Sequence, residues 1–86
     1  MANSNKKGLI DSEKELRKIG ARLRGLRKAK GYSNPDKFAY DHELNRSQYG
    51  KYEAGSTNIT IASLVNIINI FGISLEEFFG EEYGKD

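Results

Sequence analysis

Two helix-start signals that lie close together constrain this chain more than any other feature of its sequence. Asn34 precedes a proline, and Asn45 opens a second segment that ends at Gly55. An asparagine side chain accepts a hydrogen bond from the unpaired amides of a helix's first turn, and proline suits the first helical position because it has no N–H. Glycine ends a helix in the left-handed conformation. The sequence therefore predicts helices at about 35–42 and 46–54, joined by only three or four residues.

A longer helix is predicted before these two segments. Ser12 and Glu15 have the spacing of a capping box, and Gly31 offers a left-handed stop. Together they predict a helix over about residues 13–30. It has one apolar stripe, which repeats at steps of three and four and consists of Leu16, Ile19, Leu23 and Leu26.

The most apolar stretch of the chain predicts a fourth helix. Asn58 and Thr60 are its candidate caps, and Gly72 ends it. Its apolar positions are expected on one buried face, and they are Ile61, Leu64, Val65, Ile68 and Phe71.

A short fifth helix completes the predicted set. Ser74 and Glu77 repeat the capping-box spacing, and the helix runs through Phe79. No segment shows the alternation of a strand, so the predicted fold class is all-α. A chain of 86 residues is long enough for one domain. The expected organisation is an N-terminal tail at 1–10, one domain at 11–80 and an acidic C-terminal tail at 81–86.

Composition disfavours most enzyme chemistry. The chain has no cysteine and one histidine, His42, which we interpret as a turn residue. We therefore expect no metal site, no cofactor and no catalytic residues. No apolar run approaches the length of a membrane span, and the first seven residues lack the pattern of a signal peptide. A soluble, cytoplasmic protein without a membrane partner or a small-molecule substrate is expected.

The charges are distributed unevenly along the chain. Residues 1–55 carry 13 basic and 7 acidic side chains, whereas residues 56–86 carry 1 basic and 5 acidic ones. A basic amino-terminal part is typical of a protein that binds a polyanion such as nucleic acid. Charges that only keep helices solvated would give the same count.

The predicted helix 46–54 has two faces of different character. Tyr49, Tyr52 and Glu53 recur at steps of three and four and are expected to face inward. The opposite face is small, polar and basic, which suits the DNA major groove. An ordinary solvated helix face is the alternative. The candidates for contact with base edges are Arg46, Ser47, Gln48 and Lys51.

Two residues of this helix allow more than one interpretation. The Gln48 amide completes a capping box if it folds back onto the Asn45 backbone, and it then cannot reach a base. We rank it below Arg46 and Lys51 for this reason. Gly50 weakens a helix interior. It indicates either a close approach to DNA or a position where packing tolerates glycine.

Arg27 lies at the edge of the first helix's apolar stripe, where an unpaired guanidinium is costly. Glu53 is the inward-facing acid of helix 46–54. We therefore expect a structural ion pair between Arg27 and Glu53 that holds the two helices together.

These residues resemble the phage-repressor and Cro type of helix-turn-helix, the XRE family of transcriptional regulators. The resemblance covers residues 20–79 and implies a five-helix, lambda-repressor-like domain with a central helix-turn-helix. It implies that helix 46–54 enters the major groove and that the arginine and the glutamate pair. The matching residues include Leu26, Arg27, Gly31, the run Leu44 to Gly55, Leu64, Phe71 to Leu75, Phe78 and Phe79.

The resemblance also implies where DNA is contacted. Base and phosphate contacts fall on Asn45, Arg46, Ser47 and Lys51. Further phosphate contacts fall on Asn34 and Pro35, at the start of the preceding helix, and on the loop of Ser56, Thr57 and Asn58.

Three departures from the family pattern affect these expectations. The segment 33–39 is one residue longer, so the first phosphate contact falls on Ser33, Asn34 or Asp36. Glu43 replaces the turn glycine. Tyr49 replaces an aliphatic residue, and its hydroxyl requires a partner or solvent.

The expected function is sequence-specific binding of double-stranded DNA by a transcriptional regulator, acting as a homodimer on a near-palindromic operator. Phe78, Phe79 and Tyr83 are candidates for a self-complementary patch; the alternative is that the two phenylalanines close the core. The alternative function is a protein-interaction module, such as an antitoxin-like partner with the same fold.

Overall fold

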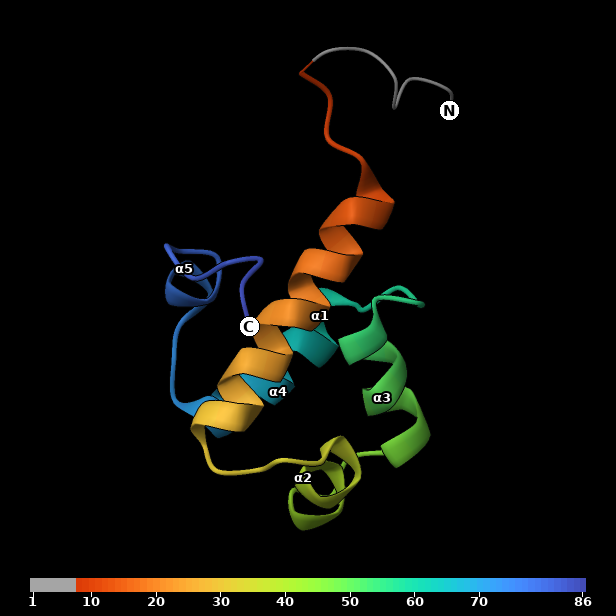
Figure 1. The fold of residues 1–86 in the computed structure, drawn as a ribbon, viewed down its shortest axis with the longest axis vertical. Helices are drawn as coiled ribbons and strands as arrows, with labels where there is room; N and C mark the ends of the chain where they lie inside the picture. The colour runs from red at the N-terminus through yellow and green to blue at the C-terminus, as the bar shows by residue number, and fades with distance from the viewer. Residues whose placement is uncertain (1–7) are drawn as a thin grey trace.

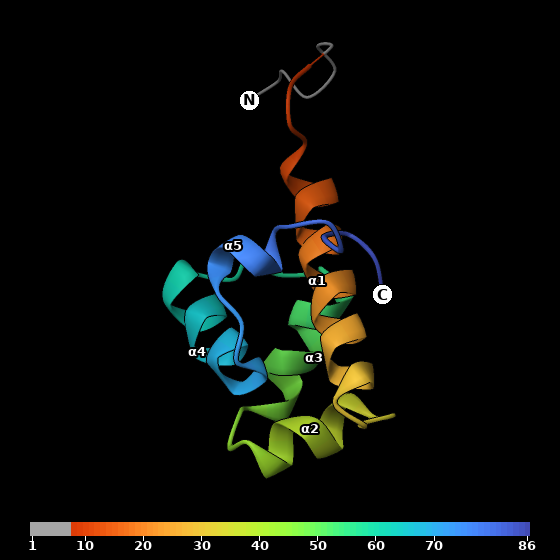
Figure 2. The same cartoon turned by 90° about the vertical axis from the view of Figure 1, so that its left-hand side faces the viewer.

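The structure, a computed structural model, describes residues 8–86 and is all-helical over that range (Figures 1 and 2). This confirms the predicted fold class. Residues 1–7 of the expected N-terminal tail lie outside the described residues. The five helices are α1 (Ser12–Ala29), α2 (Pro35–Asp41), α3 (Arg46–Ala54), α4 (Ile61–Phe71) and α5 (Leu75–Phe78).

Local capping explains why four of the five helices begin where the sequence predicts. The side chain preceding each helix accepts a hydrogen bond from an amide of the first turn. These caps are Asn34 for α2, Asn45 for α3, Thr60 for α4 and Ser74 for α5, where Glu77 completes a capping box.

The predicted cap of α1 is wrong by one residue. Asp11, and not Ser12, is the cap: its carboxylate accepts a hydrogen bond from the amide of Glu13 at 3.0 Å. The amide of Glu15 bonds to the Asp11 carbonyl. A carboxylate satisfies these donors and also interacts favourably with the positive end of the helix dipole.

The core receives side chains from every helix. Leu23 of α1, Phe38 of α2, Tyr49 of α3, Leu64 of α4 and Phe78 of α5 are all fully buried. Aromatic contacts connect several of these helices: the ring of Phe38 lies 5.1 Å from that of Tyr49 and stacks on a ring of α4 at 5.2 Å. One small core thus fixes α3 against the rest of the protein.

The predicted buried face of α4 is partly wrong. Ile61, expected inside, is 64% exposed, whereas Ile67, not expected inside, is 3% exposed. The helix buries Leu64, Ile67 and Ile68. The first turn of α4 lies beyond the core, which leaves Ile61 exposed. Ile67 contributes to the buried face instead.

Gly20 allows α1 and α3 to cross at close range. A Cβ at this position would clash with the backbone carbonyls of Tyr52 and Glu53. Only glycine permits this approach without a shift of one helix. The crossing places α3 along one side of α1, as Figure 2 shows.

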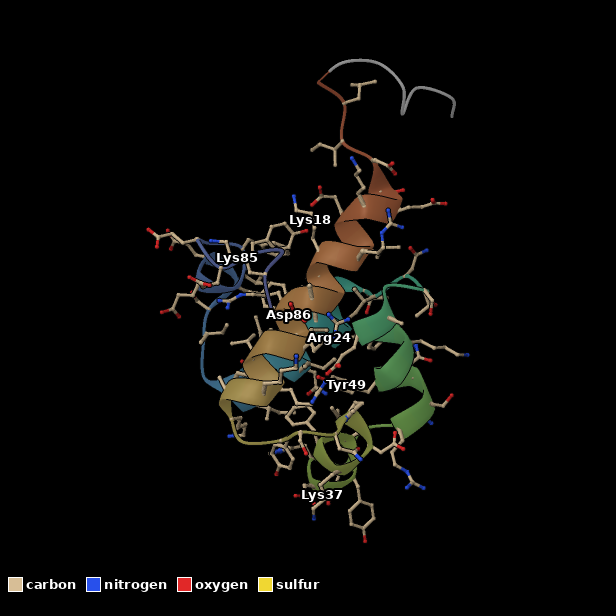
Figure 3. The ribbon with its side chains drawn as sticks, viewed as in Figure 1. Lys18, Arg24, Lys37, Tyr49, Lys85 and Asp86 are labelled. Carbon is tan, nitrogen blue, oxygen red and sulfur yellow. The ribbon has the colours of Figure 1, made fainter. Side chains whose placement is uncertain are left out.

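The segment that follows α5 lies against α1. The hydroxyl of Tyr83 donates a 2.6 Å hydrogen bond to Glu15, and Arg24 donates a 2.8 Å hydrogen bond to Asp86 (Figure 3). Residues 81–86, expected as an acidic tail, therefore make specific contacts with the first helix. Among the helices formed by residues 8–86, none has the length and apolar character that crossing a membrane requires.

Candidate nucleic-acid interface

The inner face of α3 is anchored by a buried ion pair. Arg27 donates from Nε to Oε2 of Glu53 at 2.8 Å and from Nη2 to Oε1 at 2.9 Å. A third hydrogen bond, from Nη1, goes to the carbonyl of Tyr32 at 2.9 Å. The hydrogen bonds to Glu53 raise the pKa of Arg27, against the opposing effect of burial. The structure thus brings together the two residues expected to pair, and their forked geometry fixes the rotation of α3 about its axis.

Tyr49 fills the space beside this pair. Its side chain is 1% exposed, and its hydroxyl has no hydrogen-bond partner among the described residues. Burial is the main reason that the pKa of Tyr49 is raised far above its ordinary value. The phenol therefore stays neutral, and its ring acts as a core side chain.

The outer face of α3 is free of the rest of the fold. Arg46, Ser47 and Lys51 are exposed, and within residues 8–86 their side chains form no hydrogen bond or ion pair. The remaining helices do not cover them. An exposed cationic and polar helix face, held rigidly from behind, has the chemistry that reads base edges in a major groove.

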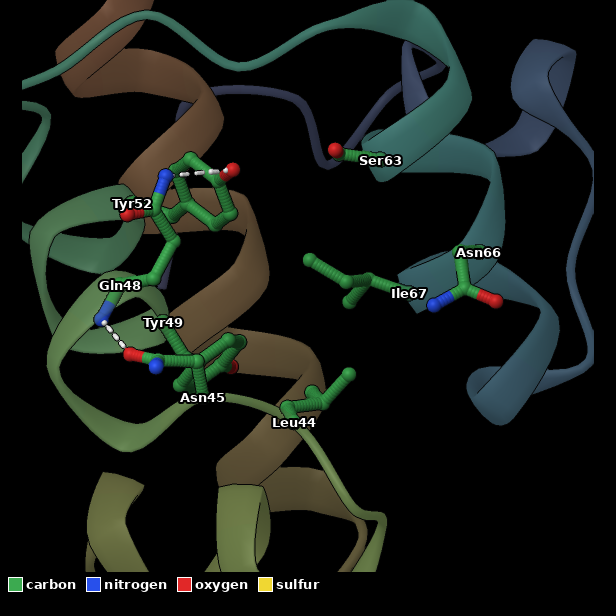
Figure 4. A pocket seen from close by; sticks show the side chains of 8 residues that line it. All are labelled: Leu44, Asn45, Gln48, Tyr49, Tyr52, Ser63, Asn66 and Ile67. Carbon is green, nitrogen blue, oxygen red and sulfur yellow. Dashed lines mark hydrogen bonds between the residues drawn. The ribbon is translucent and has the colours of Figure 1, made fainter.

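Gln48 is oriented by a partner that the sequence interpretation missed. Its amide nitrogen donates to the Tyr52 hydroxyl at 2.8 Å, while its backbone amide donates to the Asn45 side chain at 2.8 Å (Figure 4). The side chain therefore turns to Tyr52 and not back to the Asn45 backbone. The spacing of four residues on a helix is the signal that would have predicted this contact.

A cavity of about 130 Å³ separates this part of α3 from α4 (Figure 4). Its wall includes Gln48 and Tyr52 from α3 and Ser63, Asn66 and Ile67 from α4. The volume suits a few water molecules rather than a drug-sized ligand. Gln48 therefore lies between this cavity and the exposed face of α3.

Packing does not require the glycine in the middle of α3. A Cβ on Gly50 would meet no atom of the described part of the chain within 4 Å. The residue therefore does not serve a close approach between helices, in contrast to Gly20. This leaves the space above Gly50 open to a partner.

The turn between α2 and α3 contains a non-glycine residue in the left-handed region. Glu43 has a φ of 59°, as the departure from the family pattern requires. The amide of Leu44 donates to the carbonyl of Ala39 at 2.8 Å and closes the turn. The left-handed conformation costs a residue with a Cβ about 1–2 kcal/mol. The hydrogen bond and the packing of the flanking helices maintain it.

The expected phosphate contacts lie at helix ends and in one loop. Asn34 is exposed and caps α2 through the amide of Lys37 at 3.1 Å. In the loop after α3, Ser56 donates its hydroxyl to the Lys51 carbonyl at 3.4 Å. The side chains of Thr57 and Asn58 form no hydrogen bond with other described residues. The loop is directly continuous with α3, whereas Asn34 belongs to the helix packed against it.

Comparison with known proteins identifies the family. A helix-turn-helix family profile matches residues 23–78, which include α2, α3 and the turn between them. The chain belongs to the helix-turn-helix family. This match confirms the XRE-type resemblance and agrees with the five-helix architecture.

Two relatives support this membership. Control protein C.MunI of Mycoplasma sp is 33% identical over 64 residues, which cover 74% of this chain and 86% of that protein. The SPbeta prophage-derived HTH-type transcriptional regulator YonR of Bacillus subtilis strain 168 is 37% identical over 58 residues. These residues cover 67% of this chain but only 53% of YonR, so the chain spans about half the length of that relative. No solved structure matches the chain.

Proposed function

We propose that this chain is a transcriptional regulator that binds double-stranded DNA by placing α3 in the major groove. One observation carries the proposal: Arg46, Ser47 and Lys51 are exposed and have no side-chain partner within residues 8–86, while Tyr49 and Glu53 hold the opposite face in the core. The family membership agrees with this proposal, and the names of the two relatives, a control protein and a transcriptional regulator, agree with a regulatory role. We also propose that the protein acts by binding and has no catalytic role.

Each residue on the exposed face has a distinct role in this proposal. Arg46 and Lys51 donate to guanine acceptors, and Ser47 contacts a neighbouring base edge. Asn45 contacts the DNA backbone through the part of its amide that capping leaves free. Gln48 keeps one amide proton and its carbonyl oxygen after bonding to Tyr52, which suffices to read an adenine.

Phosphate contacts position the protein on the duplex. Asn34 at the start of α2, next to Pro35, meets one strand of the groove. The loop of Ser56, Thr57 and Asn58 meets DNA at the other end of α3. Hydrogen bonds to phosphate fix register and carry no sequence information by themselves.

The active form is proposed to be a homodimer. Phe78 is fully buried and belongs to the core, whereas Phe79 beside it is 43% exposed and Leu75 is 37% exposed. These two side chains give α5 an apolar patch that a second copy would cover. A two-fold dimer places two copies of α3 on half-sites about one helical turn apart. We also propose that the protein acts where the DNA is, in the cytoplasm.

Selection of bound duplexes from a random pool tests the proposal. We expect a motif with two related half-sites, and we expect the affinity for it to fall steeply with salt as counterions are released. Replacing Arg46 with alanine is expected to relax the preference at one position in each half-site. Recovery of no preferred sequence would contradict the proposal.

Sedimentation analysis tests the dimer separately. A dimer at micromolar concentration is expected, and the Phe79→Asp variant is expected to shift it toward monomer. A strict monomer with and without the selected duplex would contradict the dimer but not DNA binding.

A further inference from the structure

Arg17 differs from the other arginines of α1. Arg22, Arg24 and Arg27 each donate hydrogen bonds to carbonyl or carboxylate oxygens of the protein. Arg17 is exposed, and within residues 8–86 its side chain takes part in no hydrogen bond or ion pair. The fold therefore leaves this guanidinium free for an anion from outside.

Arg17 lies beside the loop that follows α3. A Cβ placed on Gly55 would come within 2.7 Å of the Arg17 Cα, so the backbone of the loop touches α1 at this residue. Figure 1 shows the loop passing next to the middle of α1. An open hollow of about 560 Å³ lies between them, and it is lined by residues 12, 13, 16 and 17 of α1 and residues 55–58 of the loop.

Both walls of this hollow carry groups that can donate hydrogen bonds to an anion. Arg17 contributes a permanent positive charge from α1. Thr57 and Asn58 contribute side chains without partners among the described residues, and their backbone amides donate to no backbone carbonyl. Arginine, hydroxyl, amide and backbone N–H groups are the donors that commonly bind DNA phosphate oxygens.

We propose that Arg17 and the loop at residues 56–58 together bind a phosphate of the DNA backbone, which extends the interface from α3 onto α1. This inference rests on the proposed DNA binding. A DNA phosphate is the appropriate anion because the loop begins where α3 ends, so a strand bordering the groove that holds α3 passes next to the hollow. Glu13 also lines the hollow and weakens phosphate binding there.

The test compares charge-matched variants on a duplex selected by the unaltered protein. Arg17→Gln removes the proposed contact, and Lys85→Gln removes one exposed charge on the far side of α1 from α3 (Figure 3). We expect Arg17→Gln to weaken binding roughly threefold to tenfold and to reduce the slope of log affinity against log salt by about 1. Lys85→Gln is expected to leave both unchanged.

Two further measurements locate the contact. Glu13→Gln is expected to tighten binding, because it removes the acid from the hollow. Ethylation of one backbone phosphate is expected to weaken binding of the unaltered protein more than binding of Arg17→Gln, in which only the loop contacts that phosphate. Thermal unfolding of each variant checks that the fold is retained, as expected for exposed side chains.

The outcomes separate this inference from the proposed function. If the unaltered protein selects no duplex, the proposed function itself fails. If it selects one and Arg46→Ala weakens binding, DNA binding stands. The Arg17 contact is refuted if neither Arg17→Gln nor Lys85→Gln then weakens binding. Equal losses in Arg17→Gln and Lys85→Gln would also refute it, because they would reflect net charge alone.

Discussion

The cations of α1 that face the C-terminal segment have partners within the protein, whereas the cations on the outer face of α3 have none among residues 8–86. On the face of α1 that meets the C-terminal segment, Lys28 lies 3.8 Å and Arg24 2.8 Å from the Asp86 carboxylate. Arg22 bonds to two backbone carbonyls at the end of α5. On the outer face of α3, the side chains of Arg46 and Lys51 form no hydrogen bond or ion pair within the described residues.

This difference changes the meaning of the charge distribution in the sequence. Residues 81–86 fold back onto α1. Some basic side chains of the amino-terminal part therefore form ion pairs with the acidic carboxyl-terminal part. The excess of basic residues therefore overstates the charge available to DNA. The charges that matter for binding are those that the fold leaves unpaired.

The largest expected effect comes from the pair that joins the two helices. Glu53→Ala leaves the buried Arg27 guanidinium without its carboxylate, which is expected to cost about 3–5 kcal/mol of unfolding free energy. Urea unfolding measures this loss. The double variant Arg27→Met, Glu53→Leu is expected to be more stable than Glu53→Ala because no buried charge remains unpaired. A loss below about 1 kcal/mol for Glu53→Ala would show that the pair is effectively solvated.

The next effect separates binding from stability. Arg46→Ala is expected to cost about 1–3 kcal/mol of DNA-binding free energy if the side chain forms a bidentate base contact. Its unfolding free energy is expected to change by less than about 0.5 kcal/mol, because the side chain is exposed and forms no hydrogen bond or ion pair with the described residues. Titration with the selected duplex and urea unfolding measure the two quantities. A destabilised Arg46→Ala variant would contradict the view that this face is unpaired.

The features that could be predicted from the sequence are those whose causes are local. Asn34, Asn45 and Ser74 cap the helices that follow them because each cap involves amides within three residues. The pairing of Arg27 with Glu53 is an exception, because it joins two helices; it followed from helical periodicity on both of them and from the cost of an unpaired guanidinium.

The features that escaped prediction depend on how distant segments meet. Tyr83 bonds to Glu15 across 68 positions, and no local pattern specifies that contact. The exposure of Ile61 depends on where α4 leaves the core, not on its period. Arg17 also could not be predicted as a site residue. Its neighbour Gly55 belongs to a distant loop, which lies beside Arg17 only in the folded protein.

A smaller effect is expected where α3 meets the core. Tyr49→Phe removes a buried hydroxyl that has no partner among the described residues, so it is expected to stabilise the protein by about 1 kcal/mol. The aromatic contact with Phe38 is kept. Urea unfolding measures the gain, and DNA affinity is expected to stay unchanged because the ring faces away from the groove. A loss of stability would mean that the hydroxyl is hydrogen-bonded.

The smallest effect is expected where the C-terminal segment contacts α1. The hydrogen bond from Arg24 is the main reason that the pKa of Asp86 is lowered. A carboxyl group with a lowered pKa in the folded state stabilises the protein above its ordinary pKa of about 4, and this contribution disappears as the pH falls through the folded-state value.

Asp86→Asn is therefore expected to lower the thermal midpoint slightly at neutral pH and to match the unaltered protein in acid below the folded-state pKa. High salt is expected to remove the difference as well, since the pair is exposed. Thermal unfolding at two pH values and two salt concentrations measures this. Because Arg24 keeps its 2.8 Å hydrogen bond to the Glu53 carbonyl and neither Arg24 nor Lys28 lies on the outer face of α3, DNA affinity is expected to change much less than in Arg46→Ala. If Asp86→Asn instead increased DNA affinity by as much as Arg46→Ala decreases it, the C-terminal segment would compete with DNA for these cations. The number of cations available to DNA would then depend on the position of that segment.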